Sequence, residues 1–284
     1  MVQVRASMHG AVSIVNAIAT GRGATLGISL GIETTVVAEP GKGIFFENRE
    51  SSLSARLIRS VVETSVPKPD LERNRLRISV KTEIPSGYGL KSSSAISSAI
   101  SLACAKIFKP GAADLEILRD GVHASIQSKV SITGAFDDAC ACYFGGFAVT
   151  DNTNIKIIRS EKAPADLSSV IFIPKSRRRG NVKKLRVLEN IFAQAWDLAS
   201  KSEYWNAMIL NGLATSTLLG SDPRILTELI ESGALGASVS GNGPAIAAVA
   251  RNDKISNVKK VFSSLEGETL VSPINNKKAE VYEV

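Results

Sequence analysis

Alternating apolar and polar positions between residues 76 and 84 predict a half-buried β-strand. Leu76, Ile78 and Val80 alternate with charged or hydroxyl side chains, and this period of two places the apolar side chains on one face. From residue 92 to residue 108 the apolar positions recur at intervals of three and four, which predicts a helix. Proline and glycine at 110 and 111 mark its end.

The remaining patterns predict helices and strands in both halves of the chain, which is typical of an α+β fold. The first 37 residues are expected to form a strand, a glycine-rich loop at 9–23 that contacts a ligand, and a second strand. Further strands are expected at 144–149, 155–158, 168–173, 245–250 and 279–282, and helices at 50–64, 114–129, 185–198, 205–213, 223–232 and 254–265. Because long helical patterns begin after residue 160, we predict two domains, 1–160 and 161–284.

Composition places the chain among soluble globular proteins with ample material for a core. Of its 284 residues 44% are hydrophobic and 21% are charged, and no apolar run reaches membrane-spanning length. The net charge of +7 suits an anionic ligand or a nucleic acid. Its densest basic run, 175–186, contains no aromatic residue, which disfavours a base-stacking platform. That run is either a solvated face or a patch for phosphate or carboxylate.

Cysteine and histidine usage narrows the chemistry. The three cysteines, Cys104, Cys140 and Cys142, are an odd number without zinc-site spacing, so we expect reduced thiols and a cytoplasmic protein. His9 and His123 are the only histidines. Two histidines are too few to make a histidine-based zinc site or a Ser-His-Asp triad a strong candidate.

The segment between the strand and the helix, Pro85-Ser-Gly-Tyr-Gly-Leu-Lys-Ser-Ser-Ser-Ala95, has the composition of a phosphate cradle. Its glycines allow close backbone approach to a ligand, and a helix start offers unpaired amides to an anion. An ordinary turn with a serine N-cap is the alternative. The segment is neither a Walker A loop nor a dinucleotide fingerprint, since the required glycine and lysine spacings are missing.

Two further segments carry candidate chemistry. Asp137 and Asp138 are adjacent carboxylates inside a run of small apolar residues, where each must be paired, hydrated or metal-bound. One could accept a proton or orient a hydroxyl, and the alternative is a helix N-cap. The turn Gly241-Asn-Gly243-Pro244 precedes an apolar strand and could present amides to a phosphate, or could be an ordinary turn.

Together these segments resemble the signature motifs of the GHMP kinase superfamily, and most closely those of its archaeal shikimate kinases. The resemblance extends from residue 9 to residue 250. In residues 85–95, Lys91 replaces a glycine of the superfamily motif and Ser94 replaces an alanine. The resemblance implies a ribosomal protein S5 domain 2-like N-terminal domain and a ferredoxin-like C-terminal domain. It also implies ATP and Mg²⁺ as cofactors.

The resemblance also implies roles for individual residues. Asp138 is the expected base, with Asp137 as its neighbour, and Ser93 the expected magnesium ligand. Gln127 stands where the superfamily often has a magnesium-binding glutamate, so Asp137 or another acid assists the metal, or ATP holds most of it. The expected ATP-binding residues are Ser86, Gly87, Tyr88, Gly89, Leu90, Lys91, Ser92, Ser93, Ser94, Ala95 and Ile96. The expected substrate-binding residues are Asn16, Thr20, Arg22, Gly241 and Gly243, and the candidate carboxylate-binding residues are Arg22, Arg177 and Arg178.

The function implied by the resemblance is ATP-dependent phosphorylation of shikimate to shikimate 3-phosphate. Homoserine kinase or another small-molecule GHMP kinase is the alternative within the class. From a different class, a non-catalytic GHMP-like binding or regulatory protein, or a basic nucleic-acid binder, remains an alternative that the paired aspartates disfavour. We expect small-molecule partners only, without nucleic acid or membrane.

Overall fold

A bent seven-stranded sheet organises the first half of the chain. The computed structural model describes residues 1–47, 54–177 and 180–284. The sheet order is β11-β1-β2-β4-β3, with β5 on the first part of β2 and β6 beside β5. All its pairs are antiparallel except β3 with β4. The strands are β1 (Val2–Val15), β2 (Arg22–Pro40), β3 (Gly43–Phe46), β4 (Asn74–Thr82), β5 (Phe147–Asp151), β6 (Lys156–Glu161) and β11 (Glu280–Glu283).

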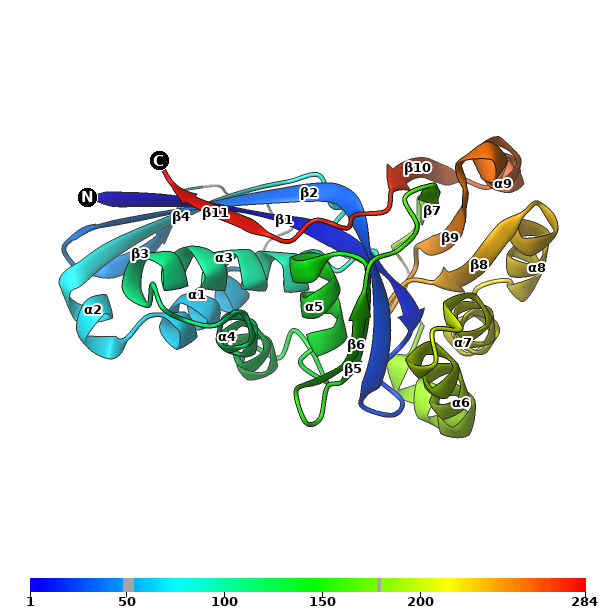
Figure 1. The fold of residues 1–284 in the computed structure, drawn as a ribbon, viewed down its shortest axis with the longest axis horizontal. Coiled ribbons are helices and arrows are strands. Elements are labelled where there is room, and N and C mark those ends of the chain that lie inside the picture. Colours follow the sequence, from blue (N-terminus) through cyan, green and yellow to red (C-terminus); the bar gives the residue numbers. More distant parts are fainter. Residues whose placement is uncertain (48–53, 178–179) are drawn as a thin grey trace.

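The long hairpin of β1 and β2 carries the chain from the first sheet towards the second half of the molecule (Figure 1). Residues 22–26 of β2 pair with β5, whereas residues 32–40 pair with β4. Two register shifts in β1, between His9 and Ala11 and between Ser13 and Val15, mark bulges in the hairpin. Because a bulge bends its strand, the end of the hairpin can turn away from the sheet and reach the loops of the other unit.

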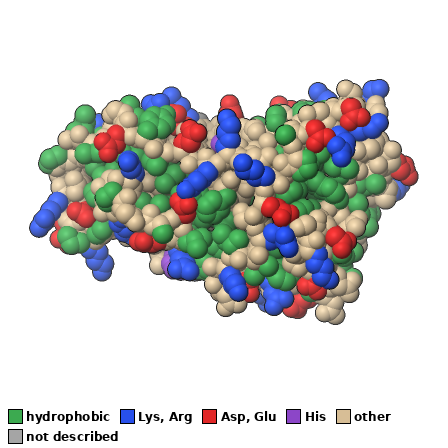
Figure 2. Space-filling model, viewed as in Figure 1, with side chains coloured by type: hydrophobic (Ala, Val, Ile, Leu, Met, Phe, Trp, Pro, Cys, Tyr) green, Lys and Arg blue, Asp and Glu red, His purple; other side chains and the backbone are tan. Residues whose placement is uncertain are grey.

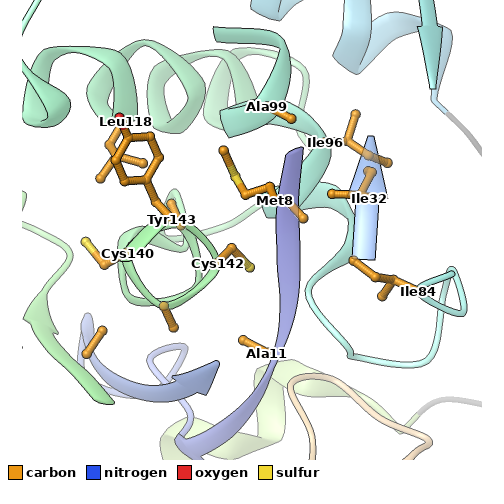
Figure 3. Close-up of a cluster of buried hydrophobic side chains, with 14 of the residues drawn as sticks. Met8, Ala11, Ile32, Ile84, Ile96, Ala99, Leu118, Cys140, Cys142 and Tyr143 are labelled. Atoms are coloured by element: carbon orange, nitrogen blue, oxygen red, sulfur yellow. The ribbon is translucent and has the colours of Figure 1, made fainter. Parts of the chain in front are cut away.

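Helices cover one face of this sheet (Figure 1). They are α1 (Ala55–Ser65), α2 (Lys68–Arg73), α3 (Ser92–Phe108), α4 (Asp114–Gln127) and α5 (Phe136–Phe144). The serines of α3 are buried without penalty where their hydroxyls find helical acceptors, as Ser97 Oγ does at the carbonyl of Ser93, 2.8 Å away. Figure 3 shows the core between sheet and helices, where Met8 of β1 lies near Tyr143 and Cys142 of α5.

The second unit is a four-stranded antiparallel sheet in the order β10-β7-β9-β8. Chain order and sheet order together give the βαββαβ arrangement of a ferredoxin-like domain, which confirms the predicted fold class. Its strands are β7 (Leu167–Pro174), β8 (Ala234–Val239), β9 (Ile246–Arg251) and β10 (Gly267–Pro273), and its helices are α6 (Glu189–Ser200), α7 (Tyr204–Leu219), α8 (Pro223–Glu231) and α9 (Ile255–Val261). The division at residue 160 stays a prediction, and β11 returns to the first sheet.

Several local expectations were wrong. The expected loop at 9–23 shrinks to the turn at 16–21, because β1 continues to Val15. Strand β8 at residues 234–239 was not predicted, because it is almost fully buried and its sequence lacks the alternation of a one-sided strand. Helix α5 and strands β3 and β10 were not anticipated. Part of the helix expected at 50–64 lies outside the described residues, and α1 begins at Ala55.

Three features of the structure relate to the expectation of a cytoplasmic protein with reduced thiols: the cysteines, the surface charges and the helix lengths. Cys104, Cys140 and Cys142 are free and buried. On the face shown in Figure 2, lysines and arginines are interspersed with aspartates and glutamates. Within the described part of the chain, none of the helices combines the length and apolar character needed to cross a bilayer. The cytoplasmic location stays a prediction.

Candidate active site

A cleft of about 400 Å³ lies where α3, α4 and α5 of the first unit meet the β8–β9 loop of the second. Its wall brings together residues from four distant parts of the sequence, within 13–18, 87–94, 125–138 and 241–242. The lining residues that carry the argument below are Ser13, Asn16, Gly87, Gly89, Lys91, Ser92, Ser93, Ser94, Lys129, Asp137, Asp138, Gly241 and Asn242. The three segments singled out in the sequence therefore converge on one cavity.

Lys91 lies at the start of α3 and reaches into the centre of the cleft. Its Nζ is 3.0 Å from Asp138 Oδ1 and donates a hydrogen bond to Ser13 Oγ at 2.7 Å. The backbone of Lys91 is left-handed, with φ of 65°, a conformation that costs a residue with a Cβ about 1–2 kcal/mol and glycine almost nothing. A glycine at this position would suit the backbone better, so the contacts of the lysine side chain must offset the backbone cost.

The two aspartates lie in the first turn of α5 and have different surroundings. Asp137 is 3% exposed, and its oxygens accept hydrogen bonds from Thr25 Oγ1 at 2.8 Å and from Asn152 Nδ2 at 2.8 Å. Asp138 faces Lys91 and lies 3.1 Å from the same Thr25 hydroxyl. Asp137 is thus fixed on both sides, whereas Asp138 is held by a cation at the cleft.

Burial raises the pKa of the Asp138 carboxyl to about 6. The Lys91 ammonium opposes this shift, the neighbouring Asp137 carboxylate adds to it, and the hydrogen bond from Thr25 lowers the pKa. A carboxylate with a pKa near 6 is largely ionised at neutral pH and is a better proton acceptor than one with the usual pKa near 4.

A pH dependence follows from this shift. If Asp138 must be ionised to accept a proton, kcat/KM is expected to be constant well above pH 6 and to fall about tenfold per pH unit below it. Thr25→Val removes a hydrogen bond that lowers the pKa of Asp138. The fall of kcat/KM at low pH, its acid limb, is therefore expected to begin at a higher pH in this variant. The control is Thr217→Val, at an exposed position. Protonation of the nucleotide changes the pH profiles of both variants equally, so a difference between the two profiles comes from the protein. Identical acid limbs would contradict the assignment.

The β8–β9 loop closes the cleft through hydrogen bonds to the first unit. Gly241 N donates to Ser13 Oγ at 2.9 Å, and Asn16 Nδ2 donates to the Gly241 carbonyl at 2.7 Å. Ser240 Oγ donates to the Gly89 carbonyl at 2.8 Å. Ser13 therefore links the loop of the second unit to the Lys91 ammonium of the first.

Gly89 tests this closure, because its φ is 87° and a Cβ there would collide with the backbone carbonyl of Ser240. Gly89→Ala is expected to push the β8–β9 loop away and to lower kcat/KM by at least about tenfold through misplacement of the site. The matched control is Gly111→Ala, where a Cβ meets nothing within 4 Å. Steady-state kinetics and thermal melting of both variants check the expectation, and a fully active Gly89→Ala enzyme would refute it.

About half of the expected ATP-binding residues line the cleft. Gly87, Gly89, Lys91, Ser92, Ser93 and Ser94 do so. Leu90, Ala95 and Ile96 lie in the hydrophobic core instead, at most 4% exposed, because they face the sheet. Tyr88 packs under Arg177, whose Nε donates to its hydroxyl at 3.2 Å. Ser86, half-buried, is also outside the lining.

Of the expected substrate-binding residues, too, some line the cleft and others do not. Asn16 and Gly241 line the cleft, whereas Gly243 faces a second cavity of about 320 Å³ behind the loop. Thr20 and Arg22 do not line the cleft: the Thr20 hydroxyl bonds the backbone of Arg22, and the exposed Arg22 side chain lies over the Trp196 ring at 5.0 Å.

None of the three arginines proposed for a substrate carboxylate is placed in the cleft wall by the described structure. Arg22 and Arg177 stack on aromatic rings outside it, because a planar guanidinium finds a favourable partner in a nearby ring face. Arg178 lies outside the described residues. The cationic side chains that do line the cleft, among the residues described, are Lys91 and Lys129.

Several site residues escaped the sequence interpretation. Thr25 and Asn152 hold the aspartates, yet each comes from a strand or turn more than ten residues away and carries no local signal. Ser13 and Asn242 lay inside recognised glycine-rich segments but were not singled out. Gln127 turns away from the cleft, towards the Ser60 hydroxyl at 3.5 Å. Within the described ranges there is no cluster of three or more acidic, histidine or cysteine ligands.

Comparisons with known proteins agree with this geometry. The family model for the GHMP kinase N-terminal domain matches residues 56–146, which include α3, α4 and α5. The shikimate kinase of Methanosarcina acetivorans is 37% identical over 281 residues, covering 96% of this chain and 95% of that protein. The chain belongs to the GHMP kinases. The shikimate kinase of Pyrococcus furiosus, 32% identical over 92% of this chain and 96% of that protein, is another such relative.

Solved structures of GHMP kinases share the fold along nearly the whole chain. Homoserine kinase from Cytophaga hutchinsonii superposes with a TM-score of 0.72 at 19% identity, covering 99% of this chain and 97% of that one. Mevalonate kinase from Methanococcus jannaschii gives 0.73 at 14% identity, covering 96% and 98%. At such identities the agreement concerns the fold of this GHMP kinase and leaves its acceptor to other evidence.

Proposed function

We propose that this GHMP kinase transfers the γ-phosphoryl group of ATP to the 3-hydroxyl of shikimate. The carrying observation is the ion pair between Lys91, at the start of α3, and Asp138, in the first turn of α5, inside a cleft closed by the second unit. Curated shikimate kinases align with 92–96% of the chain at 32–37% identity, whereas the homoserine and mevalonate kinases share the fold at below 20% identity.

The proposed chemistry uses the geometry of the cleft directly. Asp138 accepts the proton of the acceptor hydroxyl while the hydroxyl oxygen forms its bond to the γ-phosphorus. The bond from phosphorus to the leaving oxygen of ADP breaks, and the proton later passes from Asp138 to solvent. Little covalent work is asked of the protein, so positioning and charge stabilisation supply most of the acceleration.

Lys91 has a second task in this proposal. An ammonium has three N–H donors, and contacts to Ser13 and Asp138 use two of them. We assign the third to an oxygen of the transferring phosphoryl group. The α3 amides, which have no side-chain cap, provide further donors to the phosphates.

Mg²⁺ fits this site as a companion of the nucleotide. With no acidic cluster among the described residues, the protein offers single ligands, and magnesium is commonly bound by one or two protein groups together with phosphates and water. We assign the Ser93 hydroxyl, exposed in the cleft wall, as one ligand, with Asp137 as the candidate for a second. When bound, the ion would neutralise charge on the phosphates.

A panel of acceptors tests the proposal. Purified enzyme with ATP and Mg²⁺ is expected to release ADP rapidly with shikimate and at least about a hundredfold more slowly with homoserine or mevalonate, because a site built for one set of hydroxyls strongly rejects analogues that lack them. Preference for homoserine or mevalonate would overturn the choice of acceptor. ADP release independent of any acceptor would overturn the kinase assignment for all three.

A further inference from the structure

Lys129 is a cation of the cleft that neither the fold nor the proposed proton transfer uses. It follows α4, its side chain is exposed, and it belongs to the cleft lining. The other lining lysine, Lys91, is engaged with Asp138 at 3.0 Å. Across the described part of the chain, the ion pairs found include none to Lys129.

The backbone holds Lys129 in a defined and unfavourable conformation. Its φ is 58°, in the left-handed region that glycine and asparagine adopt most readily after a helix. The turn is fixed by hydrogen bonds from Lys129 N to the Ile126 carbonyl at 3.0 Å and from Val130 N to the Ser125 carbonyl at 3.1 Å. Strained positions of this kind persist where the surroundings fix them, and they cluster at ligand-binding sites.

The end of α4 lies against the first turns of α3. Ser125 Oγ is 3.3 Å from Ser97 Oγ, which in turn donates to the Ser93 carbonyl at 2.8 Å. Ser93 and Ser94 line the same cleft as Lys129. Lys129 is therefore on the side of the cleft where the helix start offers its amides.

We propose that Lys129 binds the phosphate chain of the nucleotide, on the same side of the cleft as the amides of α3. This inference rests on the proposed function in taking a nucleoside triphosphate as the anion. Two aspartates and two lysines line the cleft, and Lys91 already offsets one aspartate. Lys129 supplies the remaining positive charge that a polyphosphate requires. Its role is to bind nucleotide, so it acts on affinity and leaves the proton transfer at Asp138 unchanged.

Three substitutions separate charge from backbone conformation. Lys129→Gly and Lys129→Asn keep the left-handed turn and remove the charge, and Lys129→Arg keeps the charge. Calorimetric titration with ADP alone is expected to show affinity about tenfold weaker for the glycine and asparagine variants and within about threefold of wild type for arginine. The difference is expected to shrink in high salt. The KM for ATP is expected to rise by a similar factor in the two neutral variants.

Unchanged ADP affinity in both neutral variants would overturn the inference. If the KM for the acceptor rose at the same time, Lys129 would be assigned to an acceptor carboxylate instead. Thermal melting verifies that the variants are folded. Because ADP binding involves no acceptor, weakened ADP binding would support the inference even if shikimate proved to be the wrong acceptor.

Discussion

Replacing Asp138 by asparagine is expected to lower kcat by about 10²–10⁴-fold, the usual contribution of a positioned general base. The amide keeps the size of the side chain and can still accept hydrogen bonds from Lys91 and Thr25, which lie 3.0 and 3.1 Å from Asp138 Oδ1. It cannot take up the proton of the acceptor hydroxyl. The loss should therefore be in kcat, while ADP affinity stays within a few-fold of wild type.

The control for this variant is Asp197→Asn, an exposed aspartate on α6. It removes the same charge from the surface and is expected to leave kcat and ADP binding unchanged. Turnover by Asp138→Asn within about threefold of wild type would show that the carboxylate is not the proton acceptor. Unfolding is checked by thermal melting, since the variant must be compared as a folded protein.

Replacing Lys91 is expected to have the second largest effect. Lys91→Gly removes the ammonium while giving the left-handed backbone the residue that suits it best, so a loss of activity cannot be attributed to backbone strain. Removing one donor that stabilises transition-state charge typically costs about 10²–10³-fold in kcat. Asp138 also loses the cation that lowers its pKa, so the acid limb of kcat/KM is expected above pH 6.

Lys106→Gly would disturb the helix, so the matched control is Lys106→Met, an exposed lysine on the same helix α3. Lys106→Met is expected to retain wild-type kinetics and the wild-type acid limb. A second variant, Lys91→Met, is compared with Lys91→Gly to separate the effect of charge from that of backbone conformation. If Lys91→Gly lost little activity and its acid limb did not move, the ammonium would have neither of its two assigned tasks.

Local periodicity predicted the part of the site that lies on one strong helix. The expected helix at 92–108 is α3 itself, and the expected strand at 76–84 overlaps β4. Helix α5 was missed because nearly all its residues are buried, which removes the apolar and polar alternation that marks a surface helix. A fully buried helix has too little periodicity to be told from a loop or strand.

The partners of the aspartates could not be predicted because they depend on long-range contacts. Thr25 reaches Asp137 across more than a hundred residues of sequence, and Asn152 does so only because β5 pairs with β2. Arg22 shows the opposite case: its charge suits a carboxylate, but its side chain lies over the Trp196 ring outside the cleft wall. Residue type indicates candidate chemistry, and tertiary contacts decide which candidates meet.

The most direct test of the central claim is ³¹P NMR of the purified enzyme with Mg²⁺, ATP and shikimate. Wild type is expected to produce ADP together with one phosphomonoester resonance, which a ¹H–³¹P correlation connects to the ring proton on carbon 3 of shikimate. Asp138→Asn is expected to produce neither at a comparable rate. ATP that remains intact, ADP accompanied only by inorganic phosphate, or a phosphomonoester at another hydroxyl would contradict the claim.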